Sequence, residues 1–151
     1  MSNIRIFVSH RIDIDSETVD TPVYFPVRCG AVYDEEGNSE IQGDDTGDNI
    51  SKLRMSFCEF TVQYWAWKNV DADYYGLCHY RRYLSFSDKR YKNTVFNMVR
   101  ELKLTPHEKK KYHLDDTKKI EKTVKQYDMI IPVVAKASEM SYNRAEVKTL
   151  R

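Results

Sequence analysis

Residues 43–83 read GDDTGDNISKLRMSFCEFTVQYWAWKNVDADYYGLCHYRRY, and no other part of the chain has so much polar chemistry beside so much apolar sequence. A turn-rich acidic loop opens the stretch, and the residues after it have the apolar spacing of a helix. A short link leads to residues 74–78, an apolar run that predicts a strand, and the strand ends in a cationic segment at 79–82. A loop, a helix and a strand in this order are typical of an α/β fold.

The helix within this stretch is rich in aromatic residues. Ser56 with Glu59 three residues later forms the pattern of a capping box, although Ser51 is an alternative start. The aromatic side chains recur at the i, i+3, i+4 and i+7 positions of one helical face. A bulky apolar face of this kind usually packs in a core, so we expect these side chains to be buried. The residues concerned are Phe57, Phe60, Tyr64 and Trp67.

The rest of the chain alternates between strand and helix patterns. Residues 4–9 predict a buried first strand, and the prolines around 22–27 predict an extended segment. Strands that alternate with helices favour an open, mostly parallel sheet flanked by helices and joined by right-handed crossovers. Further elements are predicted as a helix at 94–102, an exposed basic helix or loop at 105–116, a helix at 116–126 and a last strand at 127–134.

The composition limits the classes of protein that fit. A length of 151 residues gives one domain at most or part of a larger one, and 41% hydrophobic residues is ordinary for a globular protein. The net charge of +1 argues against a bulk electrostatic grip on nucleic acid, so we expect no nucleic-acid partner and a local anion site at most. The three cysteines suit a reducing cytosol, and no apolar run approaches the ~20 residues of a membrane span.

The cationic segment after the strand at 74–78 predicts an anion site. Open α/β sheets bind ligands beyond the carboxyl ends of their strands, and arginine forks match pairs of phosphate oxygens. The alternative is a solvated strand end whose arginines pair with nearby aspartates. Aromatic neighbours of the arginines favour the anion site. Its residues are His79, Tyr80, Arg81 and Arg82.

A second group of polar residues and glycines could also contact a ligand. One histidine follows the first predicted strand, and one glycine follows the extended segment, where a close backbone approach is possible. The acidic loop could meet a ribose, a base or a metal, but its side chains could equally cap their own turns. The histidine could equally be a surface loop residue. These candidates are His10, Gly30, Asp44, Asp45, Gly47, Asp48 and Asn49.

Several segments of the chain resemble a bacterial family known as domain of unknown function 4422, whose members are described as capsular or exopolysaccharide glycosyltransferases. The resemblance is most specific at residues 43–83 and extends to about residue 132. Members of the family are longer, so we expect this chain to be an incomplete domain. The segments are GDDTGDNIS at 43–51, CEFTVQYWAWKN at 58–69 and DYYGLCHYRRY at 73–83, with looser similarity at 24–31 and 127–132.

The resemblance implies a fold of the GT-A type that binds a nucleoside-diphosphate sugar, with a UDP-sugar favoured. Residues 1–134 would form this nucleotide-sugar-binding domain, and 135–151 a polar C-terminal tail. The second partner would be a saccharide or lipid-linked acceptor, which places the chain in the cytoplasm with peripheral membrane association at the inner face. The alternative is a truncated, non-catalytic module that binds a nucleotide sugar or another anion.

The resemblance also suggests roles for the cationic segment. Many enzymes of this type hold Mn²⁺ or Mg²⁺ on the diphosphate with an Asp-x-Asp motif after a central strand. Here His79, Arg81 and Arg82 stand at that place, so we expect them to act as catalytic cations that replace some or all of the metal. The acidic loop is the alternative place for a metal.

Overall fold

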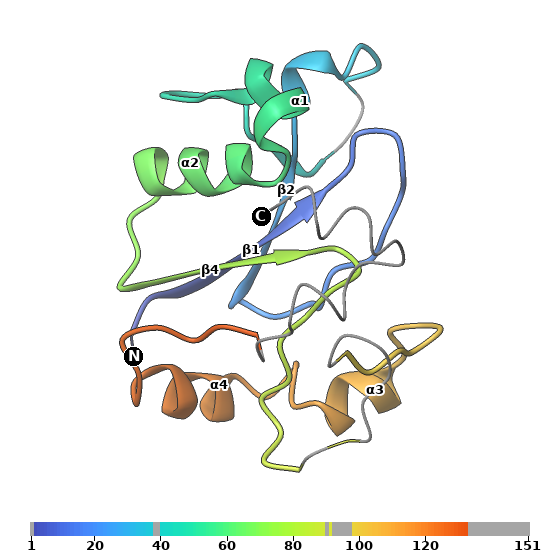
Figure 1. The fold of residues 1–151 in the computed structure, drawn as a ribbon, viewed down its shortest axis with the longest axis vertical. Helices are drawn as coiled ribbons and strands as arrows, with labels where there is room; N and C mark the ends of the chain where they lie inside the picture. The colour runs from blue at the N-terminus through green and yellow to red at the C-terminus, as the bar shows by residue number, and fades with distance from the viewer. Residues whose placement is uncertain (1, 38–39, 90, 92–97, 133–151) are drawn as a thin grey trace, which may run out of the picture.

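The computed structural model of the chain describes residues 2–37, 40–89, 91 and 98–132 (Figure 1). Its centre is an open four-stranded sheet in the order β3-β2-β1-β4, and every pair of neighbouring strands is parallel. This arrangement confirms the α/β class. The strands are β1 (Ile4–His10), β2 (Tyr24–Arg28), β3 (Gln42–Gly43) and β4 (Tyr74–His79).

Helices cover both faces of the sheet (Figure 1). On one face Phe7 of β1 packs in a cluster with Val62, Trp65 and Ala66, which belong to the helix between β3 and β4. On the other face the neighbouring Val8 packs in a cluster that includes Ile120. The helices are η1 (Ala31–Tyr33), η2 (Ser51–Leu53), α1 (Arg54–Phe57), α2 (Phe60–Asn69), α3 (Pro106–Lys111) and α4 (Thr117–Val124).

The segment predicted only as extended is strand β2, and it tolerates Pro26 for a geometrical reason. Cys29 donates its backbone N–H to the carbonyl of His10 on β1, at 2.8 Å. Because strand residues alternate in direction, the N–H groups of odd-numbered residues face β1, and Pro26 faces the opposite side. On that side β3 pairs only with Val27 and Arg28. The missing proline N–H therefore removes no hydrogen bond from the sheet.

The predicted helix at 56–67 is broken in two, and its predicted buried face is wrong. Cys58 has φ 47° and ψ −129° and separates α1 from α2, so Ser56 lies inside α1 and the capping box does not form. The face of α2 against the sheet is Thr61, Val62, Trp65 and Ala66, of which only Trp65 is aromatic. Small and β-branched side chains let the helix lie close to the sheet. Three other aromatics of the predicted face, Phe57, Phe60 and Trp67, are exposed.

Two predictions in the last third of the chain do not hold for the described residues. Of the helix expected at 94–102, residues 94–97 lie outside the description, and 98–102 have no helical structure. Of the strand expected at 127–134, residues 127–132 are neither paired nor buried, and 133–134 lie outside the description. An apolar run forms a strand only where a neighbour supplies hydrogen bonds and cover, and none of the described segments does so here. The predicted tail at 135–151 also lies outside the description.

The helix predicted at 116–126 is confirmed as α4. Asp116 caps it by accepting the backbone N–H of Lys119 at 2.9 Å, and Ile120 is fully buried. The basic segment predicted at 105–116 contains the short helix α3, and Lys111 there pairs with Glu101 at 2.7 Å. Within the described residues, no helix has both the length and the apolar character needed to cross a bilayer.

Candidate active site

The ends of β1 and β4 bring the first predicted histidine and the cationic segment together. The last paired residues of the two strands are Ser9 and His79, and the backbone N–H of Tyr80 donates to the Ser9 carbonyl at 3.1 Å. Three rings then stack in sequence, because Tyr80 lies between His79, at 4.2 Å between centroids, and His10, at 6.0 Å. The carboxyl ends of β1 and β4 thus place His10 and the cationic segment side by side.

His79 has a defined tautomer at this edge. Its Nδ1 accepts the backbone N–H of Arg81 at 3.1 Å, so the proton of the neutral ring lies on Nε2. The Nε2 atom faces the carboxylate of Glu59 at 3.6 Å. Burial holds the pKa of His79 below its ordinary value; Glu59 opposes this shift, and the charges of Arg81, Arg82 and Arg11 add to it. His79 is therefore a neutral N–H donor near pH 7, which corrects the expectation that it supplies a fixed positive charge.

Arginine side chains surround this donor. Arg81 and Arg82 follow β4 in a tight turn closed by a hydrogen bond of 2.8 Å from the Arg82 N–H to the His79 carbonyl. Both are exposed, and the Arg81 guanidinium lies 5.1 Å from the centre of the Tyr80 ring. Arg11 follows β1 and pairs with Asp13, with 2.7 Å between its Nε and the carboxylate. Arg81 and Arg82 make the end of β4 locally cationic, although the chain as a whole is nearly neutral, whereas the charge of Arg11 is balanced by Asp13.

Arg54 at the start of α1 adds a further cation near this edge. Its aliphatic stem crosses Gly30, where an added Cβ would lie 2.1 Å from the Arg54 Cδ. Its charge contributes to lowering the pKa of Asp13, which is the ion-pair partner of Arg11. Gly30 has φ 71°, so the positive φ and the close approach that its position suggested are both real. The approaching group is Arg54 of the chain itself, which corrects the prediction that Gly30 receives a ligand.

His10 is not free to bind a substrate. It is 2% exposed, and its two ring nitrogens make hydrogen bonds of 2.6 Å to the hydroxyls of Ser16 and Thr18. Burial lowers its pKa, so the ring is neutral. The histidine fixes the loop after β1 against the sheet, and its ring stacks on the ring of Tyr80. This corrects both the predicted binding role and the alternative that His10 is a surface residue.

Asp44 is likewise a structural residue. Its carboxylate is fully buried and accepts hydrogen bonds from the backbone N–H groups of Gly30 and Ala31, both at 2.9 Å. It also accepts the hydroxyls of Ser51 and Thr61, both at 2.6 Å. All four acceptor positions are used within the chain, so none is left for a ribose, a base or a metal. The prediction that Asp44 binds substrate is corrected accordingly.

The rest of the acidic loop lies away from the cationic segment. The backbone N–H of Asp48 donates to Asn69 Oδ1 at 3.1 Å, and the Asn69 amide donates to the Asp48 carbonyl at 2.8 Å. Asn69 is the last residue of α2. At 1.5 Å per residue, this helix end is roughly 15 Å from the end that faces His79. Gly47 packs against the same Asn69, and Asn49 bonds back to the Asp45 and Gly47 carbonyls, both at 3.0 Å. Gly47 and Asp48 are therefore separated from the cationic segment by the length of α2.

The described residues contain no group of three or more His, Cys, Asp or Glu side chains that could hold a metal ion. Asp44 is saturated within the chain, and Asp48 bonds to Asn69 at the far end of α2. The side chains present at the carboxyl edge fit an anion better than a protein-built Mn²⁺ or Mg²⁺ site.

Three residues of this edge were absent from the predicted site. Arg11 follows directly on β1, and a rule that collects cations after every strand would have found it. Glu59 resembled a helix cap in the sequence, and only the break at Cys58 turns it toward β4. Arg54 had no sequence signal, since its place depends on how α1 crosses the end of β2.

Sequence comparison defines the class of the protein. Residues 5–149 match the family described as domain of unknown function DUF4422, and the chain belongs to this family. The chain is also similar to the apo structure of WbbM, a bifunctional glycosyltransferase, with 34% sequence identity and a TM-score of 0.66. That match covers 74% of this chain and 20% of WbbM, so the chain spans about a fifth of that protein. No curated protein matches the chain.

Proposed function

We propose that the chain is the nucleotide-sugar-binding part of a glycosyltransferase with a GT-A-like fold. Residues 1–134 would form this domain. The donor would be a nucleoside-diphosphate sugar, with UDP as the nucleotide, and the acceptor a growing capsular or exopolysaccharide chain. The reaction would take place in the cytoplasm at the inner face of the membrane. The observation that supports this most is the group of arginines around the His79 donor at the carboxyl edge, in a chain similar to a glycosyltransferase.

Each residue of the edge has a role in this proposal. Arg81 and Arg82 bind the diphosphate, because an exposed guanidinium fork can make paired hydrogen bonds to phosphate oxygens. His79 donates its Nε2–H to the oxygen that gains charge as the glycosyl bond breaks. Tyr80 fixes the ring plane of His79 by stacking. Arg11 is held beside them by its ion pair with Asp13.

Metal dependence is a separate part of the proposal. A bound Mn²⁺ or Mg²⁺ would supply positive charge at the diphosphate, with ligands drawn mainly from the nucleotide itself and from water. The arginines provide positive charge without such an ion. Binding of UDP that persists in EDTA would agree with this assignment.

Calorimetric titration with UDP, with and without MnCl₂, tests the proposal directly. Arg81→Ala and Arg82→Ala should each weaken binding by about tenfold or more, since a hydrogen bond to a charged group contributes roughly 1.5–3 kcal/mol. Lys89→Ala is the control, because this lysine is exposed and lies beyond the turn after β4. Equal affinity of both arginine variants and the wild type would refute the site.

Release of UDP from UDP-sugars separates the enzyme from the non-catalytic alternative. Turnover by the chain, reduced about a hundredfold in the arginine variants, would agree with an active transferase. UDP binding without turnover would favour a binding module that needs the rest of a longer protein for catalysis.

A further inference from the structure

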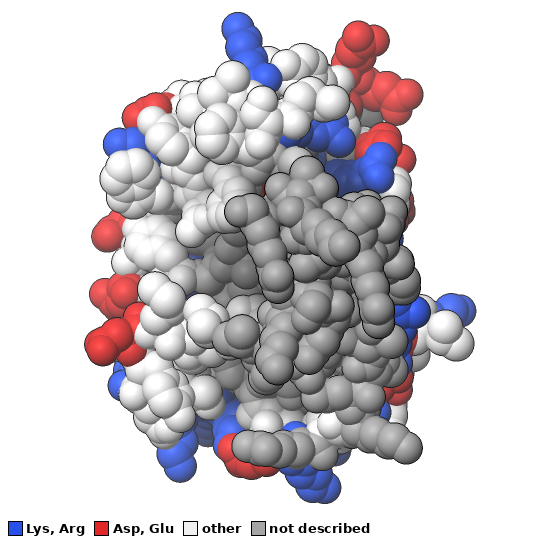
Figure 2. Space-filling model, in the orientation of Figure 1, with Lys and Arg blue, Asp and Glu red and all other residues white. Residues whose placement is uncertain are grey.

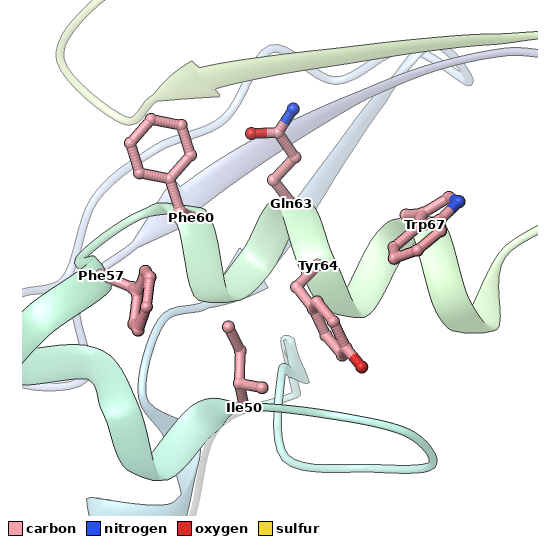
Figure 3. Close-up of a pocket in the computed structure, with 6 residues that line it drawn as sticks. All are labelled: Ile50, Phe57, Phe60, Gln63, Tyr64 and Trp67. Atoms are coloured by element: carbon pink, nitrogen blue, oxygen red, sulfur yellow. The ribbon is translucent and has the colours of Figure 1, made fainter.

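Aromatic side chains that remain exposed on α1 and α2 line a groove on the protein surface. It has a volume of about 340 Å³ and lies between α2 and the segment that leads into α1 (Figure 3). Ile50, Phe57 and Tyr64 point into the hollow between these segments, whereas Phe60, Gln63 and Trp67 project from the other side of α2. Phe60 and Trp67 are 61% and 63% exposed, although large aromatic residues are usually well buried.

A second groove of about 250 Å³ runs along the same helix. Gln63 and Trp67 line both grooves, and the second one is completed by Phe7 and by Tyr75 and Leu77 of β4. Gln63 and Trp67, with Phe60 on the same side of α2, therefore form a ridge beside the two grooves (Figure 3). Within the described part of the chain, the Gln63 amide makes no hydrogen bond and remains open to a ligand.

The grooves begin beside the candidate active site. Phe60 directly follows Glu59, whose carboxylate lies 3.6 Å from His79 at the end of β4. Phe60 and Trp67 are seven residues apart, so the aromatic ridge extends roughly 10 Å along α2, away from that edge. A chain-like ligand with one end at His79 would pass along this ridge.

The charges around the grooves select among possible occupants. Figure 2 shows that the surface over α1 and α2 is mainly uncharged. At its margins Asp48 accepts the Tyr64 hydroxyl at 3.0 Å, and the Lys68 ammonium lies 3.8 Å from the centre of the Trp67 ring. These two charges offset one another, and Glu59 beside Phe60 adds a negative charge, so the margin is not basic. An anionic lipid surface would require a basic margin, and Asp48 would repel it.

A neutral ligand with both apolar faces and hydroxyl groups fits this surface. The C–H faces of pyranose rings stack on aromatic side chains, while the free amide of Gln63 can donate to and accept from sugar hydroxyls. We propose that the ridge of Phe60, Gln63 and Trp67 with its two grooves binds a neutral oligosaccharide. The proposal rests on the proposed function in one respect, because it takes this saccharide to be the acceptor that reaches the edge at His79.

The two tryptophans of the chain allow a direct test by NMR. The indole N–H of Trp65 is donated to the Thr46 hydroxyl at 3.0 Å beneath α2, whereas Trp67 is exposed. We expect cellotetraose or maltotetraose to shift the Trp67 indole signal and to leave the Trp65 signal in place. The variant Trp67→Phe assigns the two signals.

Affinity measurements with variants complete the test. Phe60→Ala and Trp67→Ala should each weaken saccharide binding by about tenfold, the loss expected for one aromatic contact. Tyr127→Ala is the matched control, because Tyr127 is 58% exposed and lies outside the grooves. Exposed positions of this kind can be replaced without loss of the fold, which a thermal melt of each variant would verify.

The outcomes separate this proposal from the proposed function. UDP binding by Trp67→Ala should equal that of the wild type, so a loss of saccharide affinity alone supports the groove. Saccharide binding in a chain that does not bind UDP would refute the proposed function but not the groove. No shift of the Trp67 signal with either tetrasaccharide at 10 mM would refute the groove. Binding to phosphatidylglycerol vesicles that Phe60→Ala abolishes would refute it in favour of a lipid surface.

Discussion

Asp44→Asn would test whether the buried carboxylate is a structural residue. One Asp44 oxygen accepts the Ala31 N–H and the Ser51 hydroxyl, and the other accepts the Gly30 N–H and the Thr61 hydroxyl. Asparagine keeps the volume but replaces one oxygen by an NH₂ group, which cannot accept. The hydroxyl on that side can rotate and accept from the new amide. The backbone N–H cannot turn away, and it loses its partner in a fully buried place.

The expected loss follows from these bonds. One backbone N–H left without an acceptor costs about 1–3 kcal/mol, and the remaining bonds lose the strength that the charged carboxylate gave them. We therefore expect the free energy of unfolding to fall by about 2–3 kcal/mol. Urea denaturation at pH 7 followed by circular dichroism would measure the shift of the midpoint at an unchanged slope.

The neighbouring aspartate supplies the control for this experiment. Asp45 is exposed, so Asp45→Asn should change the unfolding free energy by less than about 0.5 kcal/mol. The folded fraction of Asp44→Asn should also bind UDP with the affinity of the wild type. Equal stability of the two variants would refute the structural role, and a selective loss of UDP affinity would restore the ligand-binding role predicted from the sequence.

Further predictions concern a histidine and two glycines. In an NMR titration, His79 should have a pKa below that of free histidine, and Glu59→Gln should lower it further, because the carboxylate is the group that favours the imidazolium. An unchanged or higher pKa in Glu59→Gln would contradict the contact. Gly47→Ala should lower the unfolding free energy by about 2–3 kcal/mol, since Gly47 has φ 58° and an added Cβ would lie 2.0 Å from the Asn69 Oδ1. Gly37→Ala is its control, because Gly37 has φ 60° but open space around it, and should cost about 1–2 kcal/mol; equal losses would show that the Asn69 contact has no effect.

The position of the cationic segment could be predicted from the strand ends. His79, Tyr80, Arg81 and Arg82 follow a strand whose apolar pattern was clear, and a parallel sheet places all carboxyl ends at one edge. The predicted roles of Gly30 and Asp44 failed for another reason. Both residues have the local geometry or chemistry of a binding residue. However, Arg54 occupies the space beside Gly30, and four donors within the chain occupy the acceptor positions of Asp44.

The faces of α2 show why helical spacing could not predict burial here. Phe60, Tyr64 and Trp67 have the spacing of one face, but so do Thr61, Val62, Trp65 and Ala66. The second stripe packs on the sheet because its side chains allow a close approach around Phe7 and Val27. Choosing between two possible stripes requires knowledge of the surface opposite the helix, which belongs to residues distant in the sequence.

The sequence by itself therefore determined the α/β class, the strands β1 and β4, helix α4 and the cationic segment after β4. These features depend on periodicity and on neighbours along the chain. Only the tertiary structure decided that the predicted helix breaks at Cys58, that Glu59 faces His79, and that Asp48 lies at the far end of α2 from the cationic segment. Each of these depends on contacts between residues far apart in sequence. The residues at 43–83 thus contain the cationic part of a candidate active site and an aromatic surface, and the packing of α2 places the two next to each other.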